Sequence, residues 1–268
     1  MALARRCLML HGYLSCADAF YARTGALRKA LPGVDFIYAE APLTLQMSER
    51  ELIGVCSEHQ SQYKVSVPLE ALDSRYRPEG DVDPNKCRGW FLFEMGQETT
   101  SPRVCGSVAC CDCLPRRFYG VDEARTFMLD LLQKHTPDFV LAFSQGATLL
   151  LYLLLDGYLV DFDLKVIVLV APWIPHPCTQ ASSEVICTTS PKDPITRVLL
   201  EEKELRTSAR VIMVYGEADS VISLEGLKSF RERHPGITYY THSGGHMVPG
   251  SSDMRTLLRR EFTQAGVT

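Results

Sequence analysis

The sequence lacks a long hydrophobic run and an excess of positive charge. Its longest nearly apolar stretch, residues 147–155, has about half the length that a helix needs to cross a bilayer. The 28 Lys and Arg residues are outnumbered by 32 Asp and Glu residues, which gives a formal net charge of −4. Electrostatic binding of nucleic acid usually requires a basic excess or a basic stripe. We therefore expect neither stable membrane insertion nor nucleic-acid binding.

Targeting signals and internal repeats are also missing. Residues 1–10 hold no long apolar region and no small-residue cleavage pattern, and His11 and Gly12 follow at once. The sequence ends in Thr268, without a prenylation cysteine. No repeat or low-complexity linker divides the chain. These features predict a cytoplasmic protein with a single domain over residues 1–268, and they carry no signal for an oligomeric state.

Cysteine is abundant, with ten residues in the chain. Four of them crowd into one short segment, at Cys105, Cys110, Cys111 and Cys113. Structural zinc takes paired ligands two to four residues apart with a second pair well separated, and the adjacent Cys110 and Cys111 fit this pattern poorly. We expect free or redox-sensitive thiols, with no metal and no cofactor, and keep a zinc site as the alternative.

Apolar runs alternate with amphipathic segments over much of the chain. This alternation predicts an α/β protein with a mostly parallel sheet and helices on both faces. The predicted strands are residues 7–10, 34–38, 139–143, 165–170, 210–215 and 237–241. The predicted helices are residues 17–31, 121–135, 146–156 and 224–231, with a closing helix around residues 254–262. The alternation lapses at about residues 43–117 and 172–203, which we expect to be irregular insertions, the first of them lid-like.

The most informative motif is Ala142-Phe143-Ser144-Gln145-Gly146, which joins an apolar strand directly to a helix. A serine on such a tight turn is lifted above the end of the sheet, where its hydroxyl can act as a nucleophile. The small residues Ala142 and Gly146 let the strand and the helix crowd together. The alternative is a serine that only caps a buried helix.

An acid and a base follow the serine in the order that this architecture requires. Asp219 and His246 each lie on a loop after a later predicted strand. A serine hydroxyl needs a base, usually histidine, and the base needs an acid to orient it. Three competing acids, Asp161, Asp163 and Asp193, are expected to be solvated in loops, and two competing histidines, His234 and His242, are expected at the surface. Glu217, two residues before Asp219, is a further competitor.

Two backbone N–H groups are predicted to bind the oxyanion of the reaction. One belongs to Gln145, at the N-terminus of the helix that follows the serine. The other belongs to Tyr13, with Leu14 as the next candidate, because Gly12 permits a close approach of this first loop. His11 is expected to be a structural residue.

Seven segments of the chain together resemble the FSH family of serine hydrolases. The segments are Leu10-His11-Gly12-Tyr13, residues 25–31, Ala41-Pro42-Leu43, Arg88-Gly89-Trp90-Phe91, Phe143-Ser144-Gln145-Gly146-Ala147, Tyr215-Gly216-Glu217-Ala218-Asp219 and Gly244-Gly245-His246-Met247-Val248-Pro249. The resemblance implies an α/β-hydrolase fold and hydrolysis of carboxylic esters, with medium or long acyl chains or thioesters as candidate substrates.

The resemblance also implies roles for individual residues. It maps the nucleophile, acid and base onto Ser144, Asp219 and His246, and an aromatic position of the acyl pocket onto Trp90. The alternative for Trp90 is a packing residue that anchors the insertion to the core. Two features depart from the family: Ala142 stands where a glycine is usual, and the cysteine-rich segment 105–113 has no counterpart.

The sequence therefore predicts a serine carboxylesterase that acts on a small-molecule acyl ester through an acyl-enzyme. A non-catalytic binding or scaffolding protein on the same fold is the alternative from another class, because a fold does not dictate a function. Among enzymes, a peptidase and a lipase that works at a lipid interface are the weaker alternatives.

Overall fold

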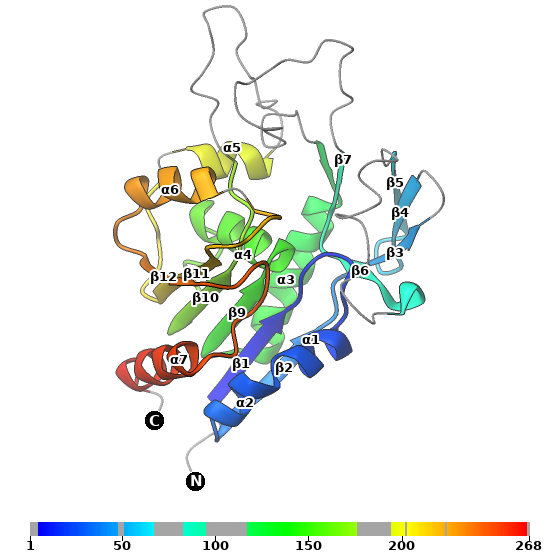
Figure 1. Ribbon diagram of the computed structural model, residues 1–268. Helices are drawn as coiled ribbons and strands as arrows, with labels where there is room; N and C mark the ends of the chain where they lie inside the picture. The colour runs from blue at the N-terminus through cyan, green and yellow to red at the C-terminus, as the bar shows by residue number, and fades with distance from the viewer. Residues whose placement is uncertain are drawn as a thin grey trace, which may run out of the picture.

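A six-stranded parallel sheet forms the centre of the protein, in the order β12-β11-β10-β9-β1-β2 (Figure 1). The computed structural model describes residues 5–47, 51–66, 83–94, 117–175, 194–201, 203–222 and 224–266. The strands are β1 (Arg5–Leu10), β2 (Val34–Ala39), β9 (Phe139–Phe143), β10 (Val166–Val170), β11 (Arg210–Gly216) and β12 (Thr238–His242). Every neighbouring pair among them runs parallel, which confirms the predicted α/β class.

Helices cover both faces of this sheet (Figure 1). One face carries α1 (Ala17–Arg23), α2 (Gly25–Ala30) and α7 (Ser252–Gln264), and the other carries α3 (Val121–His135), α4 (Gln145–Leu155), α5 (Pro194–Leu200) and α6 (Leu224–Arg233). The single helix predicted over residues 17–31 was wrong, because Thr24 divides it. The Thr24 hydroxyl donates to the carbonyl of Phe20 at 2.8 Å, and its backbone leaves helical geometry. Within the described residues, no helix is long and apolar enough to span a membrane.

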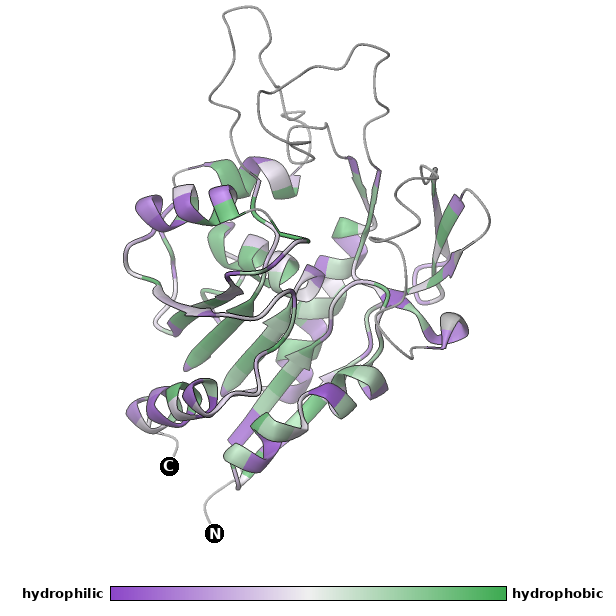
Figure 2. Cartoon of the chain, in the orientation of Figure 1, coloured by the Kyte–Doolittle hydropathy of each residue, from purple (hydrophilic) through white to green (hydrophobic). Residues whose placement is uncertain are grey.

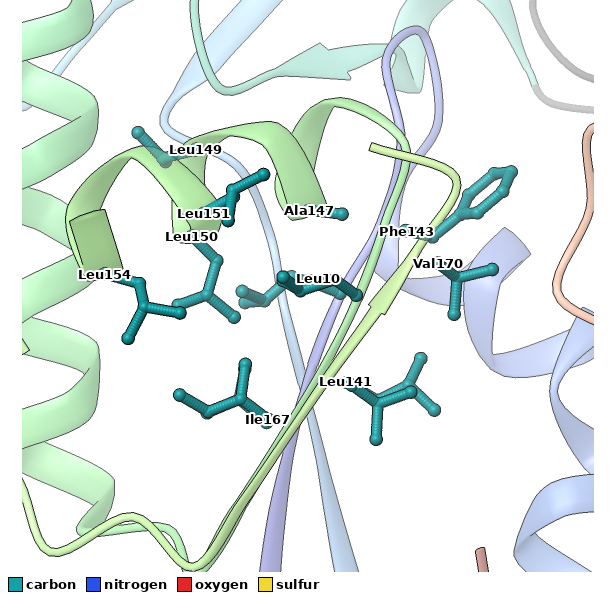
Figure 3. Close-up of a cluster of buried hydrophobic side chains, with 14 of the residues drawn as sticks. Leu10, Leu141, Phe143, Ala147, Leu149, Leu150, Leu151, Leu154, Ile167 and Val170 are labelled. Carbon is teal, nitrogen blue, oxygen red and sulfur yellow. The ribbon is translucent and has the colours of Figure 1, made fainter. Parts of the chain in front are cut away.

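The central strands are apolar throughout because helices bury both of their faces. Every residue of β9 and β10 is buried, and so is every residue of α4, which packs on them. The central strands of the sheet and α4 are accordingly green, the colour of hydrophobic residues (Figure 2). Figure 3 shows the side chains of Leu10, Leu141 and Ile167 from the sheet together with Ala147 and Leu150 of α4. This packing fixes the point at which β9 ends and α4 begins.

The stretch at about residues 43–117 contains regular strands in its described parts, so its prediction as irregular was wrong. An antiparallel sheet is formed by β3 (Leu43–Met47), β4 (Glu51–Cys56), β5 (Ser61–Ser66) and β6 (Arg88–Gly89), and a two-stranded ladder by β7 (Leu92–Glu94) and β8 (Arg117–Tyr119). Strand β4 alternates between partly exposed and buried residues, as an antiparallel strand with one covered face does. Similarly, α5 lies inside the second stretch, 172–203.

The small sheet has an apolar cluster of its own, which reaches the loop after β1. Leu14 and Cys16 of this loop pack with Leu43 and Leu92. The same loop is joined to β6, because the backbone N–H of Arg88 donates to the carbonyl of Ser15 at 2.8 Å. A short 3-10 helix, η2 (Pro84–Lys86), precedes this contact. The loop after β1 is therefore held between the two sheets.

Candidate active site

Ser144 lies at the turn from β9 into α4, with a positive φ of 52° and a ψ of −117°. Such a conformation costs a non-glycine residue about 1–3 kcal/mol and persists only where its surroundings fix it. Here the N–H of Ser144 donates to the carbonyl of Val170 at 2.8 Å, and its carbonyl accepts the N–H of Thr148 at 2.9 Å. The turn between strand and helix is therefore held in one geometry, as the sequence motif predicts.

The glycine two residues after Ser144 is required by sterics. A Cβ on Gly146 would lie 2.7 Å from the carbonyl oxygen of His11 and 3.0 Å from the indole nitrogen of Trp90. Only glycine lets α4 approach β1 this closely. Ala142, the departure from the family pattern, is fully buried in β9.

The structure brings the three residues predicted for the catalytic triad together. His246 Nε2 lies 2.9 Å from Ser144 Oγ, and His246 Nδ1 lies 2.8 Å from Asp219 Oδ2. The other oxygen of Asp219 accepts the backbone N–H groups of Val221 at 2.8 Å and Ile222 at 3.0 Å. Both oxygens of the carboxylate thus have hydrogen-bond donors within the protein, as a side chain that is only 1 % exposed requires.

The same hydrogen bonds determine the charge of Asp219. Burial acts to raise its pKa, but the hydrogen bond and charge of His246 and the two backbone N–H groups outweigh burial. The pKa therefore lies below its ordinary value, and the group is a carboxylate at neutral pH. The ring of His246 also packs against Phe143, with 4.9 Å between ring centroids.

The loops that carry the acid and the histidine are fastened to each other. The N–H of Glu217 donates to the carbonyl of His242 at 2.8 Å, and the N–H of Ala218 donates to that of Gly244 at 3.2 Å. A Cβ on Gly216 would lie 2.2 Å from the carbonyl oxygen of Gly244, so glycine is needed for this approach. Because β11 and β12 are parallel neighbours, both loops leave the same edge of the sheet.

The loop after β1 passes directly beside the serine. A Cβ on Gly12 would lie 3.1 Å from Ser144 Cβ, which accounts for the glycine. Tyr13, one of the two predicted oxyanion donors, comes next in this loop and is partly exposed. The other, Gln145, is the first residue of α4, and the first N–H groups of a helix have no acceptor within it. Gln145 thus follows Ser144 directly in the chain, and Tyr13 follows the glycine that passes beside it.

The side chain of Gln145 has a second task, which the sequence analysis missed. Its Oε1 accepts the N–H of Trp90 at 2.8 Å, and its Nε2 donates to the carbonyl of Phe91 at 2.8 Å. Gln145 thereby ties the segment between β6 and β7 to the turn that holds Ser144. A buried amide that satisfies two backbone groups cannot be recognised from local sequence, since its partners lie more than fifty residues away.

Trp90 is fully buried in the structure. Its indole N–H donates to the carbonyl of His11 at 2.8 Å, and its ring lies beside those of His11 and Phe127. These are the contacts of a packing residue that anchors the insertion, which was the alternative to the acyl-pocket role. His11 is also buried. Burial above all lowers its pKa to about 4, so it is neutral, and its Nε2 accepts the N–H of Ala41 at 3.1 Å.

The structure separates Asp163 and His234 from the site. Asp163 forms an ion pair with Lys165 before β10, at the opposite edge of the sheet. His234 is only 5 % exposed and packs on Phe230, so its prediction as a surface residue was wrong. His242 is partly buried, and its Nδ1 accepts the N–H of Gly244 at 3.1 Å. Asp193 lies outside the described residues.

Four cysteines fall in the part of the chain that the structure describes. Cys7, Cys16, Cys56 and Cys87 are buried free thiols. Burial, with smaller contributions from Cys16 and Asp83, raises the pKa of Cys87 to about 11, so this group is a thiol rather than a thiolate. No cluster of three or more His, Cys, Asp or Glu side chains suited to a metal ion occurs among the described residues. The segment 105–113, for which free or redox-sensitive thiols were predicted, lies outside them.

Serine hydrolases with the α/β-hydrolase fold combine three features: a parallel sheet, a strained serine turn and a histidine hydrogen-bonded to an aspartate. This protein has all three. Comparison with known proteins agrees. Residues 1–257 match the family described as serine hydrolase (FSH1), and the chain belongs to this family.

Individual relatives and solved structures are similar over most of the chain. Esterase OVCA2 of Mus musculus is 27 % identical over 253 residues, which span 93 % of this chain and 92 % of the relative. The crystal structure of esterase PE8 has a TM-score of 0.52 at 19 % identity and covers 96 % of this chain and 92 % of its own. That of Zea mays acyl-protein thioesterase 2 has a TM-score of 0.50 at 15 % identity, with 96 % and 94 % covered. Both structures share the α/β-hydrolase fold with this protein.

Proposed function

We propose that the protein is a serine esterase that hydrolyses a small-molecule carboxylic ester through an acyl-enzyme. The proposal is carried by the continuous chain of hydrogen bonds from Ser144 Oγ through His246 to Asp219, with distances of 2.9 and 2.8 Å. A hydroxyl bound to an imidazole that a carboxylate orients is the arrangement that makes serine nucleophilic. The similarity to esterase OVCA2 supports an ester as the substrate.

In the first half of the reaction, Ser144 Oγ attacks the carbonyl carbon and His246 Nε2 takes the hydroxyl proton. The carboxylate of Asp219 holds the Nδ1 proton and stabilises the imidazolium. The backbone N–H groups of Gln145 and Tyr13 bind the negative charge on the carbonyl oxygen. The imidazolium then gives its proton to the leaving oxygen, the ester C–O bond breaks, and the acyl group stays on Ser144.

In the second half, a water molecule attacks the acyl carbonyl while His246 takes one of its protons. The acid is released and Ser144 regains its proton from the imidazolium. A thioester would give the same acyl-enzyme with a thiol as the leaving group. An acyl-thioester therefore belongs in the assay beside the oxygen ester.

The test is ester turnover by the full chain with a matched pair of serine variants. Wild type is expected to hydrolyse p-nitrophenyl butyrate, and Ser144→Ala to lose at least about 10³-fold in kcat. Ser243→Ala, an exposed serine in the histidine loop, is expected to retain full activity. A non-catalytic binding protein would show no turnover in wild type. Unchanged turnover in Ser144→Ala would disprove the assignment of the nucleophile.

A further inference from the structure

His242 is a partly buried histidine that the proposed mechanism does not use. It is the last residue of β12, lies opposite Gly216 of β11, and stands four residues before His246. Its Nδ1 accepts the backbone N–H of Gly244 at 3.1 Å. A Cβ on Gly244 would lie 3.0 Å from this Nδ1 and 3.3 Å from Cε1. The imidazole ring therefore packs closely on the turn that leads to the catalytic histidine.

The hydrogen bond to Gly244 fixes the tautomer of His242. A neutral imidazole that accepts at Nδ1 carries its proton on Nε2. This Nε2 is buried and makes no hydrogen bond within the part of the chain that the structure describes. Because the ring has no polar partner at that end, the bond at Nδ1 is the polar contact that orients it. The imidazole thus serves the turn as a hydrogen-bond acceptor.

Gly244 connects this ring to the loop that carries the acid. Its N–H is bound by His242, and its carbonyl accepts the N–H of Ala218 at 3.2 Å. The backbone of His242 takes part as well, since its carbonyl accepts the N–H of Glu217 at 2.8 Å. Ala218 directly precedes the catalytic acid, and Gly244 lies two residues before the catalytic histidine. The side chain of His242 is therefore one end of a hydrogen-bond path that joins the two catalytic loops.

The turn needs this support because two consecutive glycines, Gly244 and Gly245, lead into His246. Glycine loses more conformational freedom on folding than any other residue, so a glycine turn is costly to hold in one geometry. The catalytic ring must nevertheless stay 2.9 Å from Ser144 Oγ and 2.8 Å from Asp219 Oδ2. A displacement of about 1 Å at a reacting group can cost about 10²-fold in rate. Loss of one hydrogen bond within the turn is therefore expected to slow the reaction.

We propose that His242 is a positioning residue, whose neutral imidazole accepts the N–H of Gly244 and thereby holds His246 in line with Ser144 and Asp219. This inference rests on the proposed esterase function and deepens it. His242 acts through the backbone of Gly244 and not on the reacting atoms.

Protonation of His242 would remove the hydrogen bond, because an imidazolium carries a donor on both nitrogens. Burial, the largest effect, lowers the pKa of His242, whereas the charges of Asp219 and Glu217 act to raise it. Both acids belong to the loop after β11, and residues 243–245 of the turn bring no charged side chain. With its pKa below the ordinary value, the ring is neutral and can accept the hydrogen bond at neutral pH. It loses this ability in acid.

The experiment compares His242→Asn and His242→Leu in p-nitrophenyl butyrate hydrolysis at neutral pH. Asparagine keeps an acceptor, because its side chain commonly binds backbone two residues further on. Leucine fills the space without an acceptor. His242→Leu is expected to lower kcat by at least about tenfold, with less than about a twofold change in KM, and His242→Asn to recover most of that loss.

Ser243→Ala is the matched control, because Ser243 is the exposed neighbour of His242 in the same turn. It should keep wild-type kcat and KM. Circular dichroism shows whether each variant is folded. A general loss of packing would affect His242→Asn and His242→Leu alike, since both remove the aromatic ring. Recovery by asparagine therefore separates the role of the acceptor from the role of packing.

The pH profile of kcat/KM gives a second readout, measured from about pH 4 to about pH 8. Full activity of wild type requires both His246 and His242 to be unprotonated, whereas in His242→Asn it requires this only of His246. The acid limb of wild type should therefore be steeper than that of His242→Asn. If His242→Leu does not fold, this comparison still tests the inference, because it needs only wild type and the asparagine variant.

Wild-type kcat in folded His242→Leu would overturn the inference, and so would equal losses in the two variants or identical acid limbs. Failure of the proposed function looks different, because wild type would then hydrolyse no ester. In that case the rate at which a fluorophosphonate labels Ser144 still tests the inference. This rate should fall in His242→Leu and return in His242→Asn. Equal labelling rates in wild type and both variants would show that His242 does not position the catalytic histidine.

Discussion

Replacement of Asp219 by Asn should inactivate the enzyme by changing the tautomer of His246. In the native site, Asp219 Oδ1 accepts two backbone N–H groups, from Val221 and Ile222, and Oδ2 accepts the imidazole. The single oxygen of an asparagine is therefore held at the Oδ1 position. Its NH₂ group then faces His246 Nδ1.

The opposite orientation of the amide would place NH₂ against two backbone donors. A buried donor left without an acceptor costs about 1–3 kcal/mol, so this orientation is the minor one. With an NH₂ donor at Nδ1, His246 carries its proton on Nε2 and cannot accept the proton of Ser144. A triad with this tautomer loses about 10⁴-fold in kcat, or about 5.4 kcal/mol of transition-state stabilisation.

The assay is p-nitrophenyl butyrate hydrolysis by purified Asp219→Asn, with circular dichroism to show that the variant is folded. Glu217→Gln is the matched control, because Glu217 is exposed and lies two residues before Asp219. It should retain wild-type kcat. A folded Asp219→Asn variant with more than about a tenth of wild-type kcat would refute the tautomer argument.

Three further predictions concern stability and the role of Trp90. The pKa of Asp219 lies below its ordinary value of 3.8, so its carboxylate adds stability above that pH. This stability is lost as the pH falls through the folded pKa. The Tm of wild type should therefore fall more than the Tm of Asp219→Asn between about pH 5 and about pH 2. Gly146→Ala should lower the free energy of unfolding by about 1–3 kcal/mol in urea, since its Cβ meets the His11 carbonyl, whereas Gly236→Ala, where a Cβ meets nothing within 4 Å, should not. Trp90→Phe should lower the free energy of unfolding by about 1–3 kcal/mol, because the His11 carbonyl loses its indole donor. It should leave unchanged the ratio of kcat/KM for p-nitrophenyl octanoate to kcat/KM for p-nitrophenyl acetate; a changed ratio would show that Trp90 contacts the acyl chain.

The central sheet could be predicted from the sequence because its strands are buried on both faces. Phe139–Phe143 and Val166–Val170 are continuous apolar runs, and such runs stand out against amphipathic helices. The loops at the carboxyl ends of parallel strands meet at one edge of the sheet. A parallel sheet therefore predicted that Ser144, Asp219 and His246 lie at the same edge. The hydrogen-bond distances add the geometry that a sequence cannot supply.

The small antiparallel sheet was missed because its strands alternate between buried and partly exposed residues, whereas the central strands are continuous apolar runs. Glu51–Cys56 alternates between covered and partly exposed residues, and Gly54 weakens the pattern further. A search for continuous apolar runs does not detect such a strand. The break at Thr24 was missed because it is a departure of a single residue from helical geometry, with φ −97° and ψ 14°.

The sequence left two roles open for Trp90. The resemblance mapped an aromatic position of the acyl pocket onto this residue, with a packing residue that anchors the insertion as the alternative. The structure buries Trp90 fully, and its indole N–H donates to the carbonyl of His11 at 2.8 Å. The sequence could not decide between the two roles, because this partner lies far from Trp90 in the chain.

The central claim is that the chain Ser144–His246–Asp219 activates one serine of this protein. Its most direct test is to treat the full chain with a fluorophosphonate and to map the modified residue by mass spectrometry after proteolysis. The account predicts one adduct per chain, on Ser144, and its loss in His246→Ala. An unmodified Ser144, or an adduct on another residue while Ser144 stays free, would contradict it.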